Sequence, residues 1–307
     1  MKTKIAIVTL LLFSIATLGQ EVKVTSGKVV RFANFKSKFV DARNIDVWLP
    51  KAYSTTEKYA VLYMHDGQML FDAESSWNKQ AWEVDEVAGK LIIEEKTKNF
   101  IVVGIWNNGL KRHPEYFPQK PYITFDATQK KFISESLKQR KKIDTEEFKV
   151  ISDNYLKFIV KELKPFVDKN FNTYSNQSNT FIAGSSMGGL ISLYAICEYP
   201  KIFGGAACLS THWTGIYQNE NNPIPDAIMH YLNKHLPKPK NHKIYFDYGN
   251  QTLDSLYKPS QEKVNKIMIS KGYSDKSWNT IFFPGKDHSE KSWHDRLNIP
   301  LEFLLSK

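Results

Sequence analysis

The sequence has few of the residues that build disulfide scaffolds, zinc clusters or fibrous repeats. Its 307 residues include 2 cysteines, 15 glycines and 13 prolines, which excludes a cysteine-stapled domain, a Cys-rich zinc site and a collagen-like chain. It also lacks a phosphate-binding P-loop, a Gly-x-Gly-x-x-Gly dinucleotide fingerprint and the His/Cys spacing of a metal site. We therefore expect neither a cofactor nor a metal.

Long apolar runs are scarce as well, and the uncharged stretch Ile5–Leu18 is about 14 residues long, whereas a membrane-spanning helix needs about 20. Lys2 and Lys4 precede this stretch, small residues end it, and no cysteine follows to carry a lipid. The pattern predicts a cleaved secretion signal over residues 1–20. We therefore expect a secreted or periplasmic protein without stable membrane insertion, in which residues 21–307 form a single domain.

The composition of the remaining chain is typical of a soluble globular protein, with 42% hydrophobic and 24% charged residues. Lys and Arg number 42 against 32 Asp and Glu, a formal charge of +10 that cleavage after residue 20 lowers to +8. Basic and aromatic residues do not alternate along any segment, so nucleic acid is not an expected partner. The positive charge favours a neutral or anionic substrate. The oligomeric state is left open.

Short β-rich segments alternate with longer segments of helical periodicity. Several of the β-rich segments are continuously apolar, as in parallel strands that are covered on both faces. The pattern predicts an α/β fold with a mostly parallel sheet and helices on both faces. The predicted strands are 29–35, 44–49, 60–65, 100–105, 180–183, 205–209, 243–247 and 279–283, and the predicted helices are 77–95, 153–170, 190–199, 225–236, 260–271 and 292–304. The long irregular stretch 117–150 is a possible lid or insertion.

The most specific motif is Gly-x-Ser-x-Gly centred on Ser186, between an apolar strand and a helix. A sharp strand-to-helix turn exposes such a serine as a nucleophile, and the helix start directs the amide of Met187 toward a developing oxyanion. Ser185 is the competing hydroxyl, but it lies one residue away from the apex of the turn.

A serine nucleophile needs a base and an orienting acid, which follow it in the order acid, then histidine, in hydrolases of this architecture. His288, directly after the last predicted strand, fits the base. Two aspartates are candidates for the acid: Asp247 ends the preceding strand 243–247, and Asp254 lies in the loop that follows it. The loop position favours Asp254, because the acid must reach across to the histidine. Asp287 is a weaker candidate because it adjoins His288 in sequence.

The loop after the strand 60–65 is the expected source of a second oxyanion donor. The amide of Gln68 is the first choice and that of Gly67 the second, whereas His65 and Asp66 are expected to hold the loop by hydrogen bonds. Substrate contacts are expected where other strands end at the same edge of the sheet. The candidates there are Trp106, Arg112 and Trp213.

Three separated motifs resemble the putative esterase family, which includes esterase D and the feruloyl, acetylxylan and enterochelin esterases. They are His65-Asp66-Gly67-Gln68, Gly184-Ser185-Ser186-Met187-Gly188-Gly189, and His288-Ser289-Glu290 with Trp293 and Arg296. The resemblance implies an α/β-hydrolase fold with Ser186 as nucleophile, Asp254 as acid and His288 as base. Many members have a plain His-Gly pair in the first motif, and here Asp66 intervenes.

These observations predict a secreted serine esterase that cleaves carboxylic esters of acylated carbohydrates through an acyl-enzyme. The expected partner is a small-molecule or oligosaccharide ester. A siderophore esterase and an acyltransferase with the same triad are alternatives, and a non-catalytic carbohydrate-binding protein is the least favoured.

Overall fold

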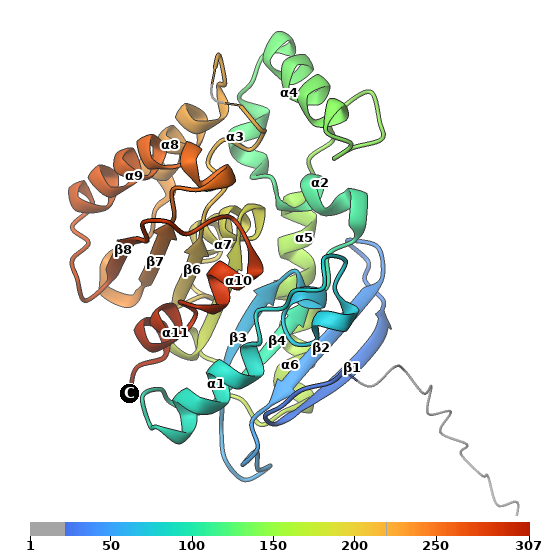
Figure 1. The fold of residues 1–307 in the computed structure, drawn as a ribbon, viewed down its shortest axis with the longest axis vertical. Helices are drawn as coiled ribbons and strands as arrows, with labels where there is room; N and C mark the ends of the chain where they lie inside the picture. The colour runs from blue at the N-terminus through green and yellow to red at the C-terminus, as the bar shows by residue number, and fades with distance from the viewer. Residues whose placement is uncertain (1–21, 219) are drawn as a thin grey trace, which may run out of the picture.

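The apolar segments of the chain assemble into one eight-stranded sheet with the order β1-β2-β4-β3-β5-β6-β7-β8 (Figure 1). The first strands, β1 (Lys28–Phe35) and β2 (Arg43–Leu49), pair antiparallel, and β2 is antiparallel to β4 (Phe100–Ile105). All neighbours from β4 to β8 are parallel. The other strands are β3 (Ala60–His65), β5 (Thr180–Ser185), β6 (Gly205–Leu209), β7 (Lys243–Tyr248) and β8 (Trp278–Phe282). This computed structural model describes residues 22–218 and 220–307, so the predicted secretion signal lies outside the described residues.

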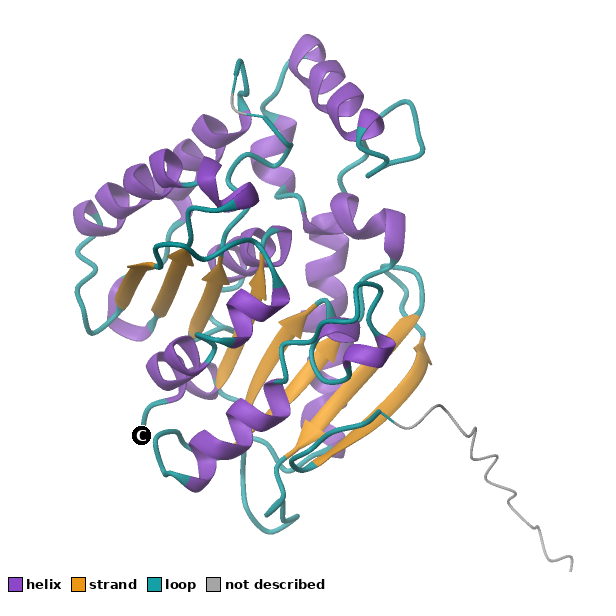
Figure 2. Cartoon of the chain, viewed as in Figure 1, coloured by secondary structure: helices purple, strands orange, loops and turns teal. Residues whose placement is uncertain are grey.

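Helices cover both faces of the sheet (Figure 2), which explains why every residue of β3, β4, β5 and β6 is buried. One face packs against α1 (Val84–Ile93), α10 (Glu290–His294) and α11 (Asn298–Leu305). The other packs against α5 (Ser152–Phe158), α6 (Lys164–Asn170), α7 (Met187–Glu198), α8 (Ile224–His235) and α9 (Lys258–Ser270). The predicted α/β class is confirmed, and the strand order is that of the α/β-hydrolase fold. Among the described residues, no helix is both long and apolar enough to cross a membrane.

Two predicted helices are shorter or broken in the structure. The segment predicted as a helix over 77–95 is helical only from Val84, because Lys79 and Glu83 adopt positive φ angles of 56° and 49° that interrupt a right-handed helix. The last predicted helix is divided into α10 and α11. Pro300 has no N–H to donate to the carbonyl of Arg296, so a continuous helix would lose a hydrogen bond there.

The segment 117–150 is mostly helical rather than irregular. It contains α3 (Gln119–Ile123) and α4 (Ala127–Gln139), and it follows the short helix α2 (Arg112–Tyr116). Asp126 and Gln129 cap α4 reciprocally, and Ile133 and Leu137 bury its inner face. Figure 1 shows α4 at the top of the molecule, beyond the carboxyl ends of the parallel strands. That this segment is an insertion or a lid stays a prediction.

Candidate active site

Ser186 lies on a strained turn between β5 and α7. Its backbone has φ 58° and ψ −124°, a conformation that L-residues adopt only when surrounding contacts hold it. Two contacts do so here: the Ser186 amide donates to the Leu209 carbonyl at 2.9 Å, and the His212 amide donates to the Ser186 carbonyl at 3.1 Å. A Cβ on Gly184 would lie 2.8 Å from the Gly188 carbonyl carbon, so the turn can close this tightly only around glycine.

His288 and Asp254 are in direct contact beside this turn. The His288 Nδ1 donates to Asp254 Oδ1 at 2.6 Å, which leaves Nε2 as the nitrogen available to a substrate. Asp254 comes from the 3₁₀ turn Thr252–Leu256 after β7 and is fully buried. Its second oxygen accepts from the Gly249 amide at 2.6 Å and the Ser210 hydroxyl at 2.7 Å. Both His288 and Ser186 line one cleft of about 540 Å³.

Asp247, the other carboxylate that the sequence left open, has a different partner. It is buried at the end of β7 and accepts from Arg296 Nη2 at 2.9 Å and Nε at 3.1 Å. Burial raises the pKa of Asp247, although the Arg296 guanidinium opposes the rise. Arg296 also donates to the Ser210 hydroxyl at 3.0 Å. Ser210 therefore links the Asp247–Arg296 ion pair to the carboxylate that contacts His288.

The loop after β3 packs directly on the N-terminus of α7. Gly188 lies so close that an added Cβ would be 3.3 Å from the His65 side chain and 3.4 Å from Asp66 Oδ2. The loop continues in the 3₁₀ turn Gly67–Met69, which contains Gln68. Met187 is the first residue of α7, so its amide has no partner within the helix. The structure thus brings the loop that holds Gln68 beside the amide of Met187.

Asp66 holds this loop through a network of charged hydrogen bonds. Its carboxylate accepts from Arg112 Nε at 2.8 Å, Arg112 Nη2 at 2.7 Å and Asn107 Nδ2 at 2.8 Å. Burial alone would raise the pKa of Asp66, but the Arg112 guanidinium more than offsets burial and holds this pKa below its usual range. His65 Nδ1 lies 2.8 Å from the Tyr155 hydroxyl. The sequence analysis expected His65 and Asp66 to hold the loop by hydrogen bonds, and both side chains make such bonds here.

Tyr257, which the sequence analysis did not assign, lies with His212 beside Ser186. The fully buried Tyr257 phenol interacts with the Ser186 hydroxyl, and its oxygen lies 2.7 Å from His212 Nδ1. Burial lowers the pKa of His212 well below 6.5, and the positive charges of Arg112 and Lys142 lower it further. The neutral His212 imidazole is therefore hydrogen-bonded to the Tyr257 phenol, next to Ser186. No local motif marks Tyr257, because the residue just before α9 and the loop after β6 meet only in the folded chain.

The predicted substrate contacts are placed differently from one another. Arg112 lines the cleft. Trp213 is fully buried and donates its indole N–H to Gln261 at 3.1 Å, which places it out of a substrate's reach and corrects the expectation of a stacking contact. Trp106 does not line the cleft either: its indole donates to Asp46 at 2.8 Å and its face is covered by Arg31.

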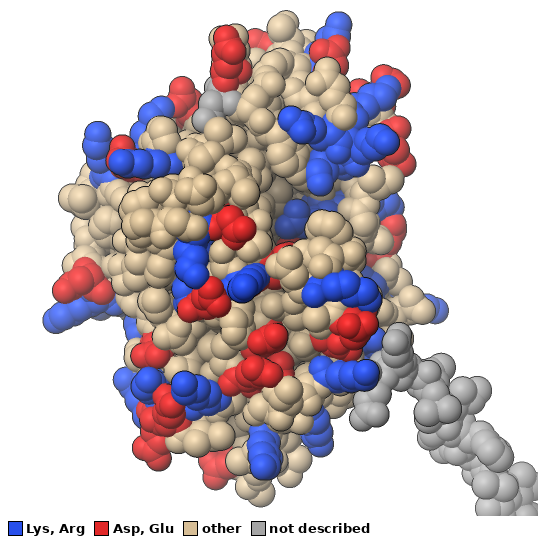
Figure 3. Space-filling view, in the orientation of Figure 1, with Lys and Arg blue, Asp and Glu red and all other residues tan. Residues whose placement is uncertain are grey.

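Other aromatic and basic residues take these places in the cleft. Trp77 lines it and is 84% exposed, and Tyr217 and Lys142 lie in the same lining. The Lys142 ammonium and the Arg140 guanidinium each lie 5.6 Å from the centre of the Tyr217 ring. Figure 3 shows Lys and Arg side chains over α4 and within the hollow beneath it. The site therefore presents positive charge and exposed aromatic surface together.

Within the described ranges, no three His, Cys, Asp or Glu side chains are grouped to hold a metal ion. The two cysteines, Cys197 and Cys208, are buried and free.

Comparison with known proteins gives one family and several relatives. The family described as "Putative esterase" matches residues 37–298. The uncharacterized protein YbbA of Bacillus subtilis is 22% identical over 273 residues, which cover 86% of this chain and 93% of that protein. An endo-1,4-beta-xylanase/feruloyl esterase of Xylanibacter ruminicola is 30% identical over 188 residues, which cover 60% of this chain and 21% of that protein.

Solved structures share the fold. A ferulic acid esterase superposes with a TM-score of 0.62 at 18% identity, covering 91% of this chain and 97% of its own. The enterobactin esterase of Shigella flexneri superposes with a TM-score of 0.63 at 16% identity, covering 92% of this chain and 60% of its own.

Proposed function

Because the chain belongs to the putative esterase family and is a carboxylic-ester hydrolase, we propose that Ser186, His288 and Asp254 act as its nucleophile, general base and orienting acid. The observation that carries this assignment is the 2.6 Å hydrogen bond between His288 and a fully buried Asp254, at the cleft that Ser186 also lines. Asp254 holds the imidazole with Nε2 directed to the cleft and stabilises the imidazolium that forms in the reaction.

In the first step, the Ser186 oxygen attacks the ester carbonyl while His288 Nε2 takes the hydroxyl proton. The amides of Met187 and Gln68 donate to the resulting oxyanion. Collapse of this intermediate breaks the bond to the alcohol, which leaves with the proton from His288. Water, deprotonated by His288, then attacks the acyl-enzyme. As the bond from the acyl carbon to the Ser186 oxygen breaks, His288 returns the proton to that oxygen and the acid is released.

We propose that the substrate is an aromatic acyl ester of a carbohydrate. The predicted secretion signal places its hydrolysis outside the cytoplasm. Trp77 and Tyr217 offer aromatic faces in the cleft, which suit a phenolic ring or a sugar. Arg112 and Lys142 favour a substrate with negative charge or hydroxyl acceptors. The feruloyl esterase activity named for the relative of Xylanibacter ruminicola agrees with this substrate class. A siderophore ester is the second candidate, because the same two cations suit a catecholate.

The nucleophile is tested by two neighbouring serines. Ser186→Ala should lower kcat for an aryl acetate by about 10⁴-fold or more with an unchanged unfolding midpoint, since triad members act as a unit. Ser185→Ala is the matched control and should lower kcat far less. If Ser185→Ala is the inactive variant and Ser186→Ala keeps its activity, the assignment is wrong.

The substrate class is tested at Trp77. We expect Trp77→Ala to lower kcat/KM for a feruloylated oligosaccharide by roughly 2- to 10-fold, the value of one aromatic stacking contact, and to leave kcat/KM for an aryl acetate unchanged. Tyr174→Ala removes an exposed aromatic ring outside the cleft and should change neither rate. Equal rates of wild type and Trp77→Ala on the feruloylated substrate would remove Trp77 from the binding site.

A further inference from the structure

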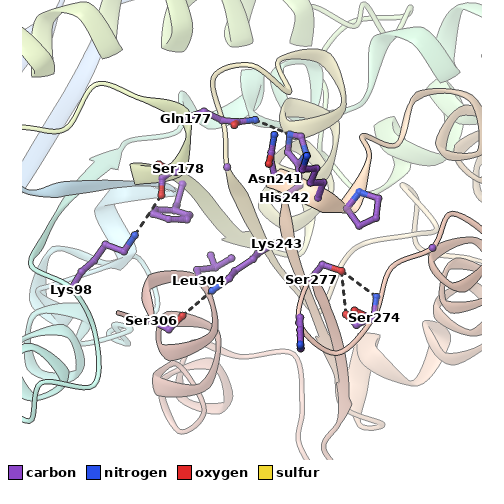
Figure 4. A pocket seen from close by; sticks show the side chains of 16 residues that line it. Lys98, Gln177, Ser178, Asn241, His242, Lys243, Ser274, Ser277, Leu304 and Ser306 are labelled. Carbon is purple, nitrogen blue, oxygen red and sulfur yellow. Dashed lines mark hydrogen bonds between the residues drawn. The ribbon is translucent and has the colours of Figure 1, made fainter.

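A second cavity, of about 790 Å³, lies at the opposite edge of the sheet from Ser186. Its lining includes Phe181 near the start of β5, Gly204 just before β6 and Lys243 at the start of β7. Ser186, in contrast, follows the carboxyl end of β5. The C-terminal segment closes one side of the cavity with Leu304 and Ser306 (Figure 4). The cavity is therefore separate from the esterase cleft.

The charge of this cavity is of one sign. Four lysines line it, Lys98, Lys240, Lys243 and Lys276, and no Asp or Glu belongs to its described lining. The other lining side chains with polar atoms are neutral amides, hydroxyls and the imidazole of His242. Both nitrogens of His242 face backbone carbonyls, those of Lys238 and Pro200, each at 2.8 Å. Both ring nitrogens of His242 are therefore engaged within the protein, and neither is available to a ligand in the cavity.

Two of the four lysines are partly buried without a carboxylate partner among the described residues. The Lys98 ammonium donates to the Asn179 side-chain oxygen at 3.1 Å and the Ser178 carbonyl at 3.4 Å. The Lys243 ammonium donates to the Ser306 hydroxyl at 2.8 Å and the Phe303 carbonyl at 3.0 Å (Figure 4). All four acceptors are neutral, so no carboxylate of residues 22–218 or 220–307 compensates either positive charge.

The lack of compensation has an electrostatic consequence. Burial lowers the pKa of both lysines, and the positive charge of Lys243 lowers that of Lys98 further. Buried cations elsewhere in the described chain are paired: Lys164 with Asp168 at 2.7 Å and Arg296 with Asp247 at 2.9 Å. Two unpaired cations that repel one another in one cavity would be stabilised by an anion placed between them.

We propose that this cavity binds a small multivalent oxyanion, a phosphate or sulfate group, between Lys98 and Lys243. A dianion matches two partly buried ammonium groups, and charge-assisted hydrogen bonds to phosphate oxygens are among the stronger polar contacts in proteins. Lys240 and Lys276, both exposed at the same cavity, add to the attraction. The volume exceeds that of a single ion, so the group can be carried by a sugar or another small molecule.

Isothermal titration calorimetry of the full chain tests the proposal with inorganic phosphate, inorganic sulfate and glucose 6-phosphate, with sodium chloride at equal ionic strength as reference. We expect saturable binding of an oxyanion and no saturable binding of chloride. Tighter binding of glucose 6-phosphate than of phosphate would assign the site to an esterified group. Equal or weaker binding would assign it to the free ion. No saturable binding of any of the three would overturn the proposal.

The site is located by variants. Lys98→Gln with Lys243→Gln should weaken binding at least tenfold, whereas the charge-matched pair Lys157→Gln with Lys169→Gln, outside the cavity, should not. Should the first pair fail to fold, the exposed pair Lys240→Gln with Lys276→Gln should still weaken binding about threefold or more. In wild type, NMR of ¹⁵N-labelled lysine should show the Lys98 and Lys243 pKa values rising on addition of phosphate. Binding that these four lysines do not affect would contradict the assignment.

Discussion

At the scale of single residues, the two aspartates associated with β7 differ in the side chain that each one contacts. Asp254 contacts His288 next to the cleft, while Asp247 is paired with a buried Arg296 behind it. A carboxylate that orients an imidazole and one that neutralises a buried guanidinium have different consequences when their charge is removed. The first controls a tautomer, and the second controls the stability of the fold.

Replacing each aspartate by asparagine should separate these roles. Asp254→Asn should lower kcat for an aryl acetate by about 10⁴-fold, because an amide no longer selects the Nδ1–H tautomer of His288. Asp247→Asn should instead lower the free energy of unfolding in urea by about 3–5 kcal/mol, because it leaves the Arg296 charge buried and unpaired. Urea unfolding and kcat are measured on both variants. The reverse pattern would make Asp247 the catalytic acid.

At the scale of elements, the geometry of the proposed oxyanion hole depends on how the loop after β3 sits between β4 and α7. Gly67 packs so closely on β4 that an added Cβ would lie 2.6 Å from the Gly104 carbonyl carbon. On its other side, the loop contacts Gly188 at the start of α7. A side chain at residue 67 would therefore displace the loop from β4 and move the amide of Gln68.

Gly67→Ala should lower kcat by roughly 10²-fold, in line with the loss of one oxyanion donor. The control is Gly272→Ala, which strains a φ of 81° but whose Cβ would meet nothing within 4 Å. This control should lose about 1 kcal/mol of stability and keep its kcat. Circular dichroism and kcat for an aryl acetate distinguish the two effects. Wild-type kcat in a folded Gly67→Ala variant would show that the loop does not need this close approach.

At the scale of the whole molecule, three buried histidines near the site make the stability of the fold depend on pH. Burial lowers the pKa of His65 and His113 to about 3, and that of His212 well below 6.5. In the unfolded chain these histidines bind protons below about pH 6.5, while in the folded chain they stay neutral until far lower pH. The unfolded state thus binds more protons over this window, so stability is complete above pH 6.5 and falls as the pH is lowered toward 3.

We expect the free energy of unfolding to fall by roughly 1.4 kcal/mol per pH unit for each of these histidines below pH 6. Urea unfolding at pH 7.5, 6 and 5 measures the slope. His113→Gln should reduce the slope by about one third, and substitution of the exposed His230 by glutamine should leave it unchanged. The Asp66 carboxylate, whose pKa is below its usual range, adds to the slope only below about pH 4. A pH-independent free energy between pH 7.5 and 5 would contradict the neutral state of these side chains.

The sequence alone determined the features that depend on local pattern. Continuous apolar segments predict the central strands because residues buried on both faces of a sheet cannot alternate in polarity. The Gly-x-Ser-x-Gly motif predicts the turn at Ser186, since its glycines and the flanking strand and helix are all within one short segment. The order of residues along the chain left Asp254, Asp247 and Asp287 as candidates for the acid, and the loop position favoured Asp254. The helix over 77–95 was predicted too long, because the positive φ angles at Lys79 and Glu83 leave no mark on apolar periodicity.

Only the tertiary structure decided which side chains meet. Strands that are distant in sequence end at one edge of the sheet, and this convergence brings Asp254 to His288 and the Tyr257 phenol to Ser186. Trp213 and Trp77 show the same dependence on packing: the first is fully buried under helices, and the second is exposed in the cleft. Burial of a side chain depends on what packs over it from elsewhere in the chain, and a sequence pattern read over a few residues does not contain that information.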